Sequence, residues 1–179
     1  MAELGNACEQ FKIILSNLLF TFMCLALCAI YFTTTGIQFW ATAFMLRVLD
    51  EDKTIVLIAY TFCALTAPLV GVSVGSYLSD RHGGYKGKNL ITALKICTVF
   101  GTSAFIFSIP IGFFGSLFYF APLLWCILCA GSALIPTAMG VLINSVDKAH
   151  RAASSSLNQL ICNLGGFFAA PIVSAYIMD

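Results

Sequence analysis

Charged residues are scarce in this sequence. Only 9% of its 179 residues are Asp, Glu, Lys or Arg, whereas a typical soluble domain has about 25%. With 60% hydrophobic residues, the chain cannot cover a surface that faces water on all sides. The net charge of +1 comes with no basic patch that alternates with aromatics, which argues against a nucleic-acid partner. The composition excludes a soluble domain and predicts an integral, multi-pass membrane protein.

The sequence also lacks the residue pattern of an enzyme or a metal site. Its two histidines, His82 and His150, lie among lysines and arginines in loops, without a nucleophile and carboxylate beside them. Except for Cys8, the eight cysteines lie inside apolar runs. Cys126 and Cys129 have CxxC spacing, but no second pair and no histidine completes a zinc set. We interpret the cysteines as small packing residues and expect no enzyme, no cofactor and no metal.

Five apolar runs are each long enough to cross a bilayer, which takes ~20 helical residues. They predict spans at about Phe11–Met45, Ile55–Leu78, Leu90–Phe114, Leu117–Val146 and Ala152–Met178. The segment over residues 1–10 is polar and has no cationic signal-peptide region. The predicted fold class is therefore all-α, a polytopic membrane helix bundle of five transmembrane helices in one domain over residues 11–179.

The loops between these spans differ in charge. The loops after the first and third spans hold only Arg47 and Lys53, which acidic residues offset. The loops after the second and fourth spans hold five cations: Arg81, Lys86, Lys88, Lys148 and Arg151. Because cytoplasmic loops are enriched in Lys and Arg, we expect the N-terminal segment and both basic loops in the cytosol. The sequence does not indicate which membrane hosts the chain.

Several residues predict irregular or tightly packed helices. The first run is too long for one straight crossing, and Thr33–Gly36 (Thr-Thr-Thr-Gly) predicts a bend or break in its middle. Alternatively, these threonines bond to carbonyls of their own helix. Pro68 predicts a kink in the second span. Gly71 and Gly75, four residues apart, predict a close approach by another helix.

Uncharged polar side chains at membrane depth form the candidate solute path. An amide without a partner in hydrocarbon is costly, so we interpret Gln38 as functional. In the fifth span, polar residues spaced three and four apart share helix faces and give two polar stripes. These stripes either line a cavity or join helices through hydrogen bonds. The candidate path residues are Gln38, Trp40, Asn144, Asn158, Gln159 and Asn163.

Two loops and one span resemble a known family. The first basic loop resembles the signature loop of major facilitator superfamily transporters in Leu78, Asp80, Arg81, Gly83 or Gly84, Lys86 and Lys88. The stretch Lys148–Ser156 is similar to the segment that leads into the eleventh helix of that family. Thr33–Trp40 and Gly83–Asn89 are similar to spinster-like members. The chain departs from the pattern at Ser76, where the family usually has glycine.

The resemblance implies a partial major-facilitator half, helices seven to eleven of a twelve-helix carrier. The third span would lie on the outside, and the other four would line the cavity. Spinster-like relatives export lipids, which implies a small or lipid-like solute. The residues implied as a cytoplasmic gate are Asp80, Arg81, Lys86, Lys88 and Arg151.

Two functions stay open at this point. The first is a transporter half, which moves its solute by alternating access and requires a second half as partner within the lipid bilayer. No acidic residue lies deep in any span, so a proton relay built on a buried carboxylate lacks its usual group. The second is a structural subunit, derived from a carrier, that packs against other membrane subunits of a larger complex.

Overall fold

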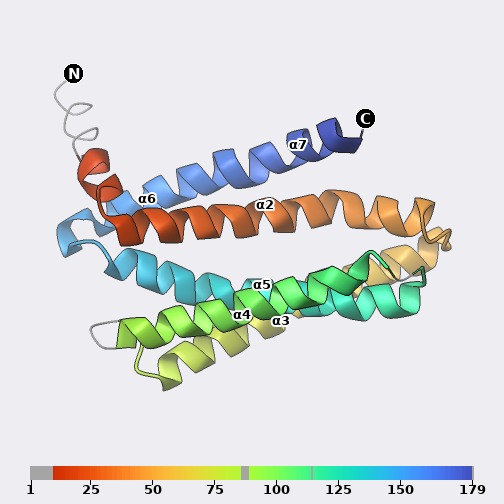
Figure 1. Ribbon diagram of the computed structural model, residues 1–179, viewed down its shortest axis with the longest axis horizontal. Coiled ribbons are helices and arrows are strands. Elements are labelled where there is room, and N and C mark those ends of the chain that lie inside the picture. Colours follow the sequence, from red (N-terminus) through yellow and green to blue (C-terminus); the bar gives the residue numbers. More distant parts are fainter. Residues whose placement is uncertain (1–9, 86–88, 114, 179) are drawn as a thin grey trace. The chain divides into compact units, whose positions relative to one another are not determined.

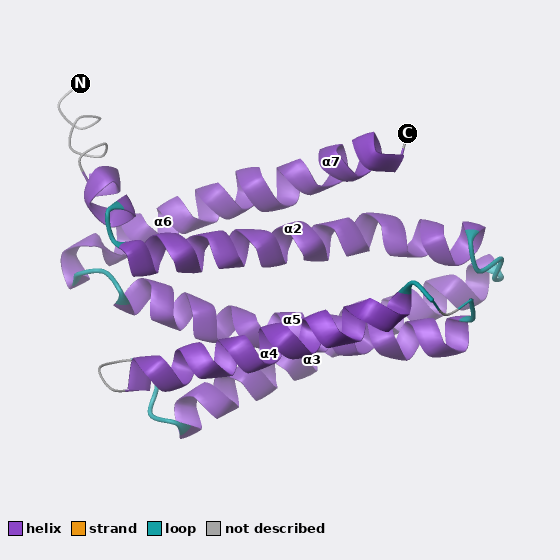
Figure 2. Cartoon of the chain, in the orientation of Figure 1, coloured by secondary structure: helices purple, strands orange, loops and turns teal. Residues whose placement is uncertain are grey.

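The computed structural model describes residues 10–85, 89–113 and 115–178. Figures 1 and 2 show helices joined by short turns, and the described residues contain no strand. Five helical stretches are long and apolar enough to cross a membrane, so the predicted all-α membrane bundle is confirmed. After a short helix over residues 10–15, the elements are α2 (Leu18–Arg47), α3 (Lys53–Arg81), α4 (Asn89–Ile111), α5 (Leu117–Asn144), η1 (Lys148–His150), α6 (Arg151–Ile161), η2 (Cys162–Phe168) and α7 (Ala169–Met178).

The first membrane helix starts at a break near its N-terminal end. The short helix over residues 10–15 stops before Asn17, and α2 begins directly after it. The side-chain Oδ1 of Asn17 accepts hydrogen bonds from the backbone N–H groups of Leu19 at 3.1 Å and Phe20 at 3.3 Å. A helix start leaves its first amides without partners, and an asparagine at this position satisfies them.

The middle of α2 is an unbroken helix. The break that we predicted at Thr33–Gly36 is wrong, because α2 continues through these residues to Arg47. The hydroxyls of Thr33 and Thr34 instead donate to the carbonyls four residues earlier, at 2.9 Å and 2.8 Å. Threonines that bond to their own helix backbone need no break to satisfy their polar groups.

The last span contains the irregular segment that we did not predict. It consists of three consecutive pieces, α6, η2 and α7, and η2 is a π-helix, with hydrogen bonds between residues five apart. Gly165 and Gly166 lie in η2 and pack closely on α2. A Cβ atom on Gly165 would collide with Sγ of Cys28, and one on Gly166 would lie 2.8 Å from Cβ of Tyr31. The π-helix therefore packs against α2 through its glycine face.

The chain divides into two compact units. Unit 1 contains the described residues up to Thr35 together with those from Ala138 onward, and unit 2 contains Gly36–Thr137. Both α2 and α5 contribute residues to both units. In unit 2, α4 has Ala93 as its buried residue, whereas α5 buries side chains along its length. The peripheral position of α4 agrees with the place that the family resemblance implies for the third span.

The core of unit 2 is formed by α2, α3 and α5, and two glycines bring α3 and α5 into close contact. A Cβ atom on Gly71 would collide with the carbonyl oxygen of Cys129, and one on Gly75 with the carbonyl oxygen of Ala133. The close approach that we predicted from these two glycines is confirmed. Because a backbone carbonyl lies opposite each glycine, a larger side chain at either position would force the two helix backbones apart.

Candidate functional site

Exposed polar side chains form a stripe along α6 and into η2, within unit 1. The members of this α6 stripe are Ser155, Ser156, Gln159 and Asn163. Nε2 of Gln159 donates a hydrogen bond to Oδ1 of Asn163 at 3.0 Å, so the two predicted path residues lie together. Leu160 and Leu164, the residues that directly follow Gln159 and Asn163, are apolar and 51% and 59% exposed. The α6 stripe is thus a strip of amides and hydroxyls on a span whose neighbouring surface suits lipid.

Asn158, a third predicted path residue on α6, faces the interior of unit 1. Its side chain is fully buried. Nδ2 donates to Sδ of Met139 at 3.5 Å, and Oδ1 accepts from Sγ of Cys162 at 3.7 Å. Both partners are sulfur atoms, which are weak hydrogen-bonding groups. In this conformation, Asn158 therefore joins α5 to α6 and η2.

The structure brings one predicted path residue and one predicted gate residue together at the end of α5. Nη2 of Arg151 donates to Oδ1 of Asn144 at 3.2 Å, and Nδ2 of Asn144 donates to the carbonyl of Gly140 at 2.8 Å. Nε of Arg151 and Nδ1 of His150 are buried and have no partner among the described residues. The first turn of α6 is therefore fixed to the last turn of α5 through one side-chain bond.

Asn17 is a residue of this region that sequence reasoning missed. Besides capping α2, it donates a hydrogen bond from Nδ2 to the carbonyl oxygen of Ser145 at 2.7 Å. Ser145 follows the last residue of α5, where helix carbonyls lack partners. An asparagine directly before an apolar run is a recognised helix-start signal, which could have identified the cap. The bond to Ser145 joins residues 128 positions apart, and no local sequence pattern predicts such a bond.

The two path residues predicted on α2 lie in unit 2. Gln38 is exposed, and its backbone carbonyl accepts a long hydrogen bond, 3.4 Å, from the hydroxyl of Tyr60. Trp40 is half-buried, and its Nε1 is buried without a partner among the described residues. A buried indole N–H usually has a hydrogen-bond acceptor. Within the described part of the chain, Trp40 thus has an unpaired donor on a helix that is long and apolar enough to span a membrane.

The predicted gate residues of unit 2 lie at the end of α3. Asp80 and Arg81 are both exposed, and within the described part of the chain neither forms an ion pair. Lys86 and Lys88 lie outside the described residues. The exposed carboxylate and guanidinium are therefore available to a partner beyond unit 2.

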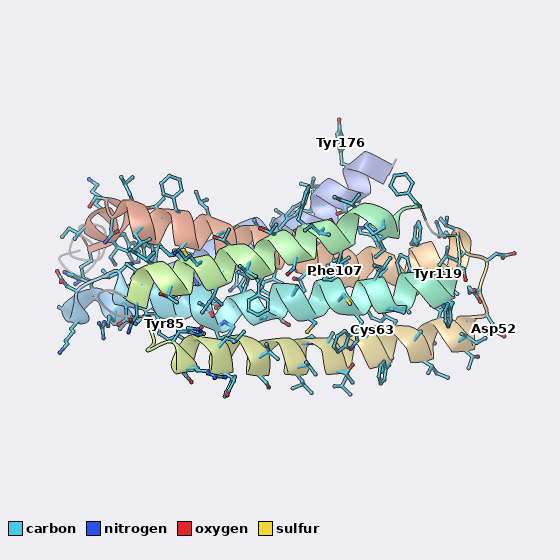
Figure 3. All side chains as sticks on the ribbon, turned by 60° about the horizontal axis from the view of Figure 1, so that its bottom comes forward. Asp52, Cys63, Tyr85, Phe107, Tyr119 and Tyr176 are labelled. Carbon is cyan, nitrogen blue, oxygen red and sulfur yellow. The ribbon has the colours of Figure 1, made fainter. Side chains whose placement is uncertain are left out.

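The turn after α3 depends on two glycines. Gly83 and Gly84 have φ angles of +88° and +77°, a left-handed conformation that glycine adopts without strain. Nδ2 of Asn89 donates to the carbonyl of Gly83 at 2.8 Å and closes the turn. In Figure 3, Tyr85 marks this basic end of unit 2, and Asp52 marks the opposite, acidic end. The charge difference between the loops is thus also a difference between the ends of unit 2.

Polar bonds also run along the contact between α3 and α5, which we call the α3–α5 seam. Oγ of Ser79 and Oγ1 of Thr137 share a buried hydrogen bond of 2.6 Å. Nε1 of Trp125 donates to Oγ1 of Thr66 at 2.8 Å. Cys63, labelled in Figure 3, donates to a carbonyl of α5 at 3.5 Å. These groups are satisfied within unit 2, in contrast to the free donor of Trp40.

Within the described residues, no group of three or more His, Cys, Asp or Glu side chains could hold a metal ion. The notable features are membrane helices, basic turns and uncharged polar groups at membrane depth. Together they define a polytopic membrane protein. A model of the Major Facilitator Superfamily matches residues 3–170, and the chain therefore belongs to this family of transporters rather than to an enzyme family. No curated protein and no solved structure shows a significant match.

Proposed function

We propose that the chain is the C-terminal half, helices seven to eleven, of a spinster-like carrier that moves a small or lipid-like solute by alternating access. A second transporter half would complete the carrier, because alternating access requires two halves that rock around a site at the membrane midplane. Family membership supports transport in general. The specific path, solute and branch are our proposals.

The α6 stripe carries the proposal. Gln159 and Asn163 expose amides on a segment that belongs to a membrane span. Polar groups that face hydrocarbon are expensive, so such groups face a water-filled cavity or protein. Their mutual bond satisfies one donor and one acceptor and leaves the remaining amide groups free for a solute. In the carrier, this stripe would line the solute path together with Gln38 and Trp40.

The orientation that we propose follows from the basic turns. With the N-terminal segment and both basic loops in the cytosol, Asp80 and Arg81 would lie at the cytosolic end of α3. The contact between Arg151 and Asn144 would lie at the same side of the membrane. These residues, with Lys86 and Lys88, would form the cytoplasmic gate, and the exposed Asp80 would pair with the other half when the gate closes.

The solute class that we propose is a small or lipid-like molecule that hydrogen-bonds to uncharged groups. All path candidates are neutral amides or an indole, and every Asp and Glu of the sequence lies outside the cores of the spans. A buried carboxylate is the usual group for a proton relay. The carrier would therefore work as a uniporter, or the second half would supply the coupling.

The alternative is a structural subunit of a larger membrane complex. Asn158 favours this alternative, because the partners of its fully buried amide, in the part of unit 1 that the structure describes, are Met139 and Cys162. An amide used in this way holds helices together and does not contact a solute. If the α6 stripe is covered by another subunit in the same manner, the chain does not transport.

Water access to residue 163 tests the proposal. Asn163→Cys would be treated, in membrane vesicles of either orientation, with a membrane-impermeant methanethiosulfonate, and each cysteine would be followed by peptide-resolved mass spectrometry. Leu164→Cys is the matched control, because Leu164 is the adjacent, apolar and exposed residue. We expect modification at position 163 and protection at position 164. Equal protection at both positions would favour the structural subunit.

A further inference from the structure

Asn17 satisfies the ends of two helices with one side chain. Its Oδ1 accepts from the first amides of α2, and its Nδ2 donates to the carbonyl of Ser145 just past α5. A carboxamide carries its acceptor and its donor on two separate atoms, so one short side chain can make both bonds at once. Aspartate could accept but not donate, and serine is too short to reach both partners. The position therefore requires an amide for reasons that go beyond helix capping.

The carbonyl that Asn17 holds lies directly beside the proposed gate contact. Ser145 follows Asn144, whose Oδ1 accepts from Nη2 of Arg151 at 3.2 Å. The backbone N–H of Ser145 donates to the carbonyl of Val141 at 2.9 Å, so its backbone continues the last turn of α5. A chain of bonds therefore runs from the start of α2 through Ser145 and Asn144 to Arg151.

Arg151 has little else to hold it. Among the residues that the structure describes, its buried Nε has no partner, and its one side-chain hydrogen bond is that to Asn144. The N-cap residue of α6, His150, makes no capping side-chain bond. The direction of the guanidinium therefore depends on where the end of α5 holds Asn144.

We infer that Asn17 is a positioning residue for the gate: by holding Ser145, it fixes the turn between α5 and α6 and thereby the direction of Arg151. The role of Arg151 in a gate rests on the proposed function, whereas the bond chain that holds it does not. In the proposed carrier, the segment that enters α2 is thus tied to the cytoplasmic end of the last described span. Displacing that segment would release Arg151.

Two substitutions separate the two bonds of Asn17. Asn17→Ser keeps a good N-cap acceptor but loses the donor to Ser145. Asn17→Gln keeps the amide donor but is a poor N-cap. The readout is the rate at which phenylglyoxal modifies Arg151 in the purified full chain, resolved by peptide mass spectrometry, with the exposed Arg47 as internal reference. Asn89→Ser is the matched control, because it removes an equivalent amide bond, to the carbonyl of Gly83, in unit 2.

The loss of one such hydrogen bond shifts an opening equilibrium by about twofold to tenfold. We expect Asn17→Ser to raise the modification rate of Arg151 by about that factor, and Asn17→Gln and Asn89→Ser to leave it near the wild-type rate. A role in capping alone predicts the reverse order of the two Asn17 variants. That order, or an unchanged rate in Asn17→Ser, overturns the inference. Water access at position 163 is measured separately, so either proposal can fail while the other stands.

Discussion

Two helix contacts in this chain both depend on glycines, but the glycines lie on different kinds of helix. In the α3–α5 seam, Gly71 and Gly75 lie on a regular helix. A Cβ on Gly71 would collide with Oγ of Ser132 and the carbonyl oxygen of Cys129, and one on Gly75 would meet backbone atoms of Ala133. In the contact between α2 and η2, Gly166 lies on a π-helix, and its nearest neighbour is a side-chain atom of Tyr31. In the first contact, a Cβ would collide with a backbone oxygen at either glycine, so a new methyl group would force the backbones apart. The second contact is less close, and its helix already departs from regular α-helical hydrogen bonding, so we expect unit 1 to tolerate displacement better.

The largest effect should come from Gly75→Ala. Its Cβ would collide with the backbone of Ala133, and overpacking of a tight core costs about 1–3 kcal/mol, occasionally more. We expect a loss of about 3 kcal/mol in unfolding free energy, measured by SDS titration in mixed micelles. Gly131→Ala on α5 is the control: a Cβ there meets nothing within 4 Å, and alanine is the better helix former by about 1 kcal/mol.

A smaller loss should follow Gly166→Ala in unit 1. The new methyl group would meet Cβ of Tyr31 at 2.8 Å and the carbonyl oxygen of Cys28 at 3.2 Å. Because the π-helix can adjust, we expect a loss of about 1–2 kcal/mol in the same titration. A loss equal to that of Gly75→Ala would mean that the two contacts are equally rigid, and the comparison between the two units would fail.

The buried hydroxyl pair of the α3–α5 seam should contribute less again. We would combine Thr137→Val and Ser79→Ala in a double-mutant cycle, since these residues share a 2.6 Å hydrogen bond. Interhelical hydrogen bonds in membrane proteins contribute about 0.6 kcal/mol on average. A coupling energy of that size is the expected result. Additive effects would show that the pair packs together without holding the helices.

The smallest effect on stability should come from the α6 stripe. Gln159→Leu removes an exposed hydrogen bond to Asn163 and touches no buried group. We expect the unfolding free energy to stay within about 0.5 kcal/mol of the wild type, as for most surface substitutions. A loss well above 1 kcal/mol would show that the stripe holds the bundle together, which is the role expected of a structural subunit.

Hydropathy predicted the parts of the fold that depend on composition. Five apolar runs gave five membrane helices, and the Gly71 and Gly75 spacing gave a close helix approach, because both signals are local. The prediction of a break at Thr33–Gly36 was wrong because a threonine hydroxyl can either disrupt a helix or bond to a carbonyl of the same helix. Which of the two occurs depends on the residues packed around it. The π-helix at Gly165 depends on how tightly α2 packs against it, and no local pattern encodes that contact.

In the candidate site too, contacts between residues near in sequence could be predicted and contacts between distant residues could not. The pairing of Gln159 with Asn163 follows from their four-residue spacing, and the structure contains it. The burial of Asn158 and the contact of Arg151 with Asn144 depend on which helix faces are covered. Asn17 was missed because its role joins the beginning of α2 to the end of α5. Polar residues whose partners are distant in sequence therefore require a structure.

The exposed surface of α4 has a consequence for how this chain can evolve. Ala93 is its buried residue, and large side chains such as Phe105 and Ile109 are more than half exposed. Lipid requires only that such side chains be apolar, whereas a packed neighbour also requires a particular shape. Among orthologues, most positions of α4 should therefore exchange one apolar residue for another freely, and drift should stop at Ala93, where a larger side chain has no room.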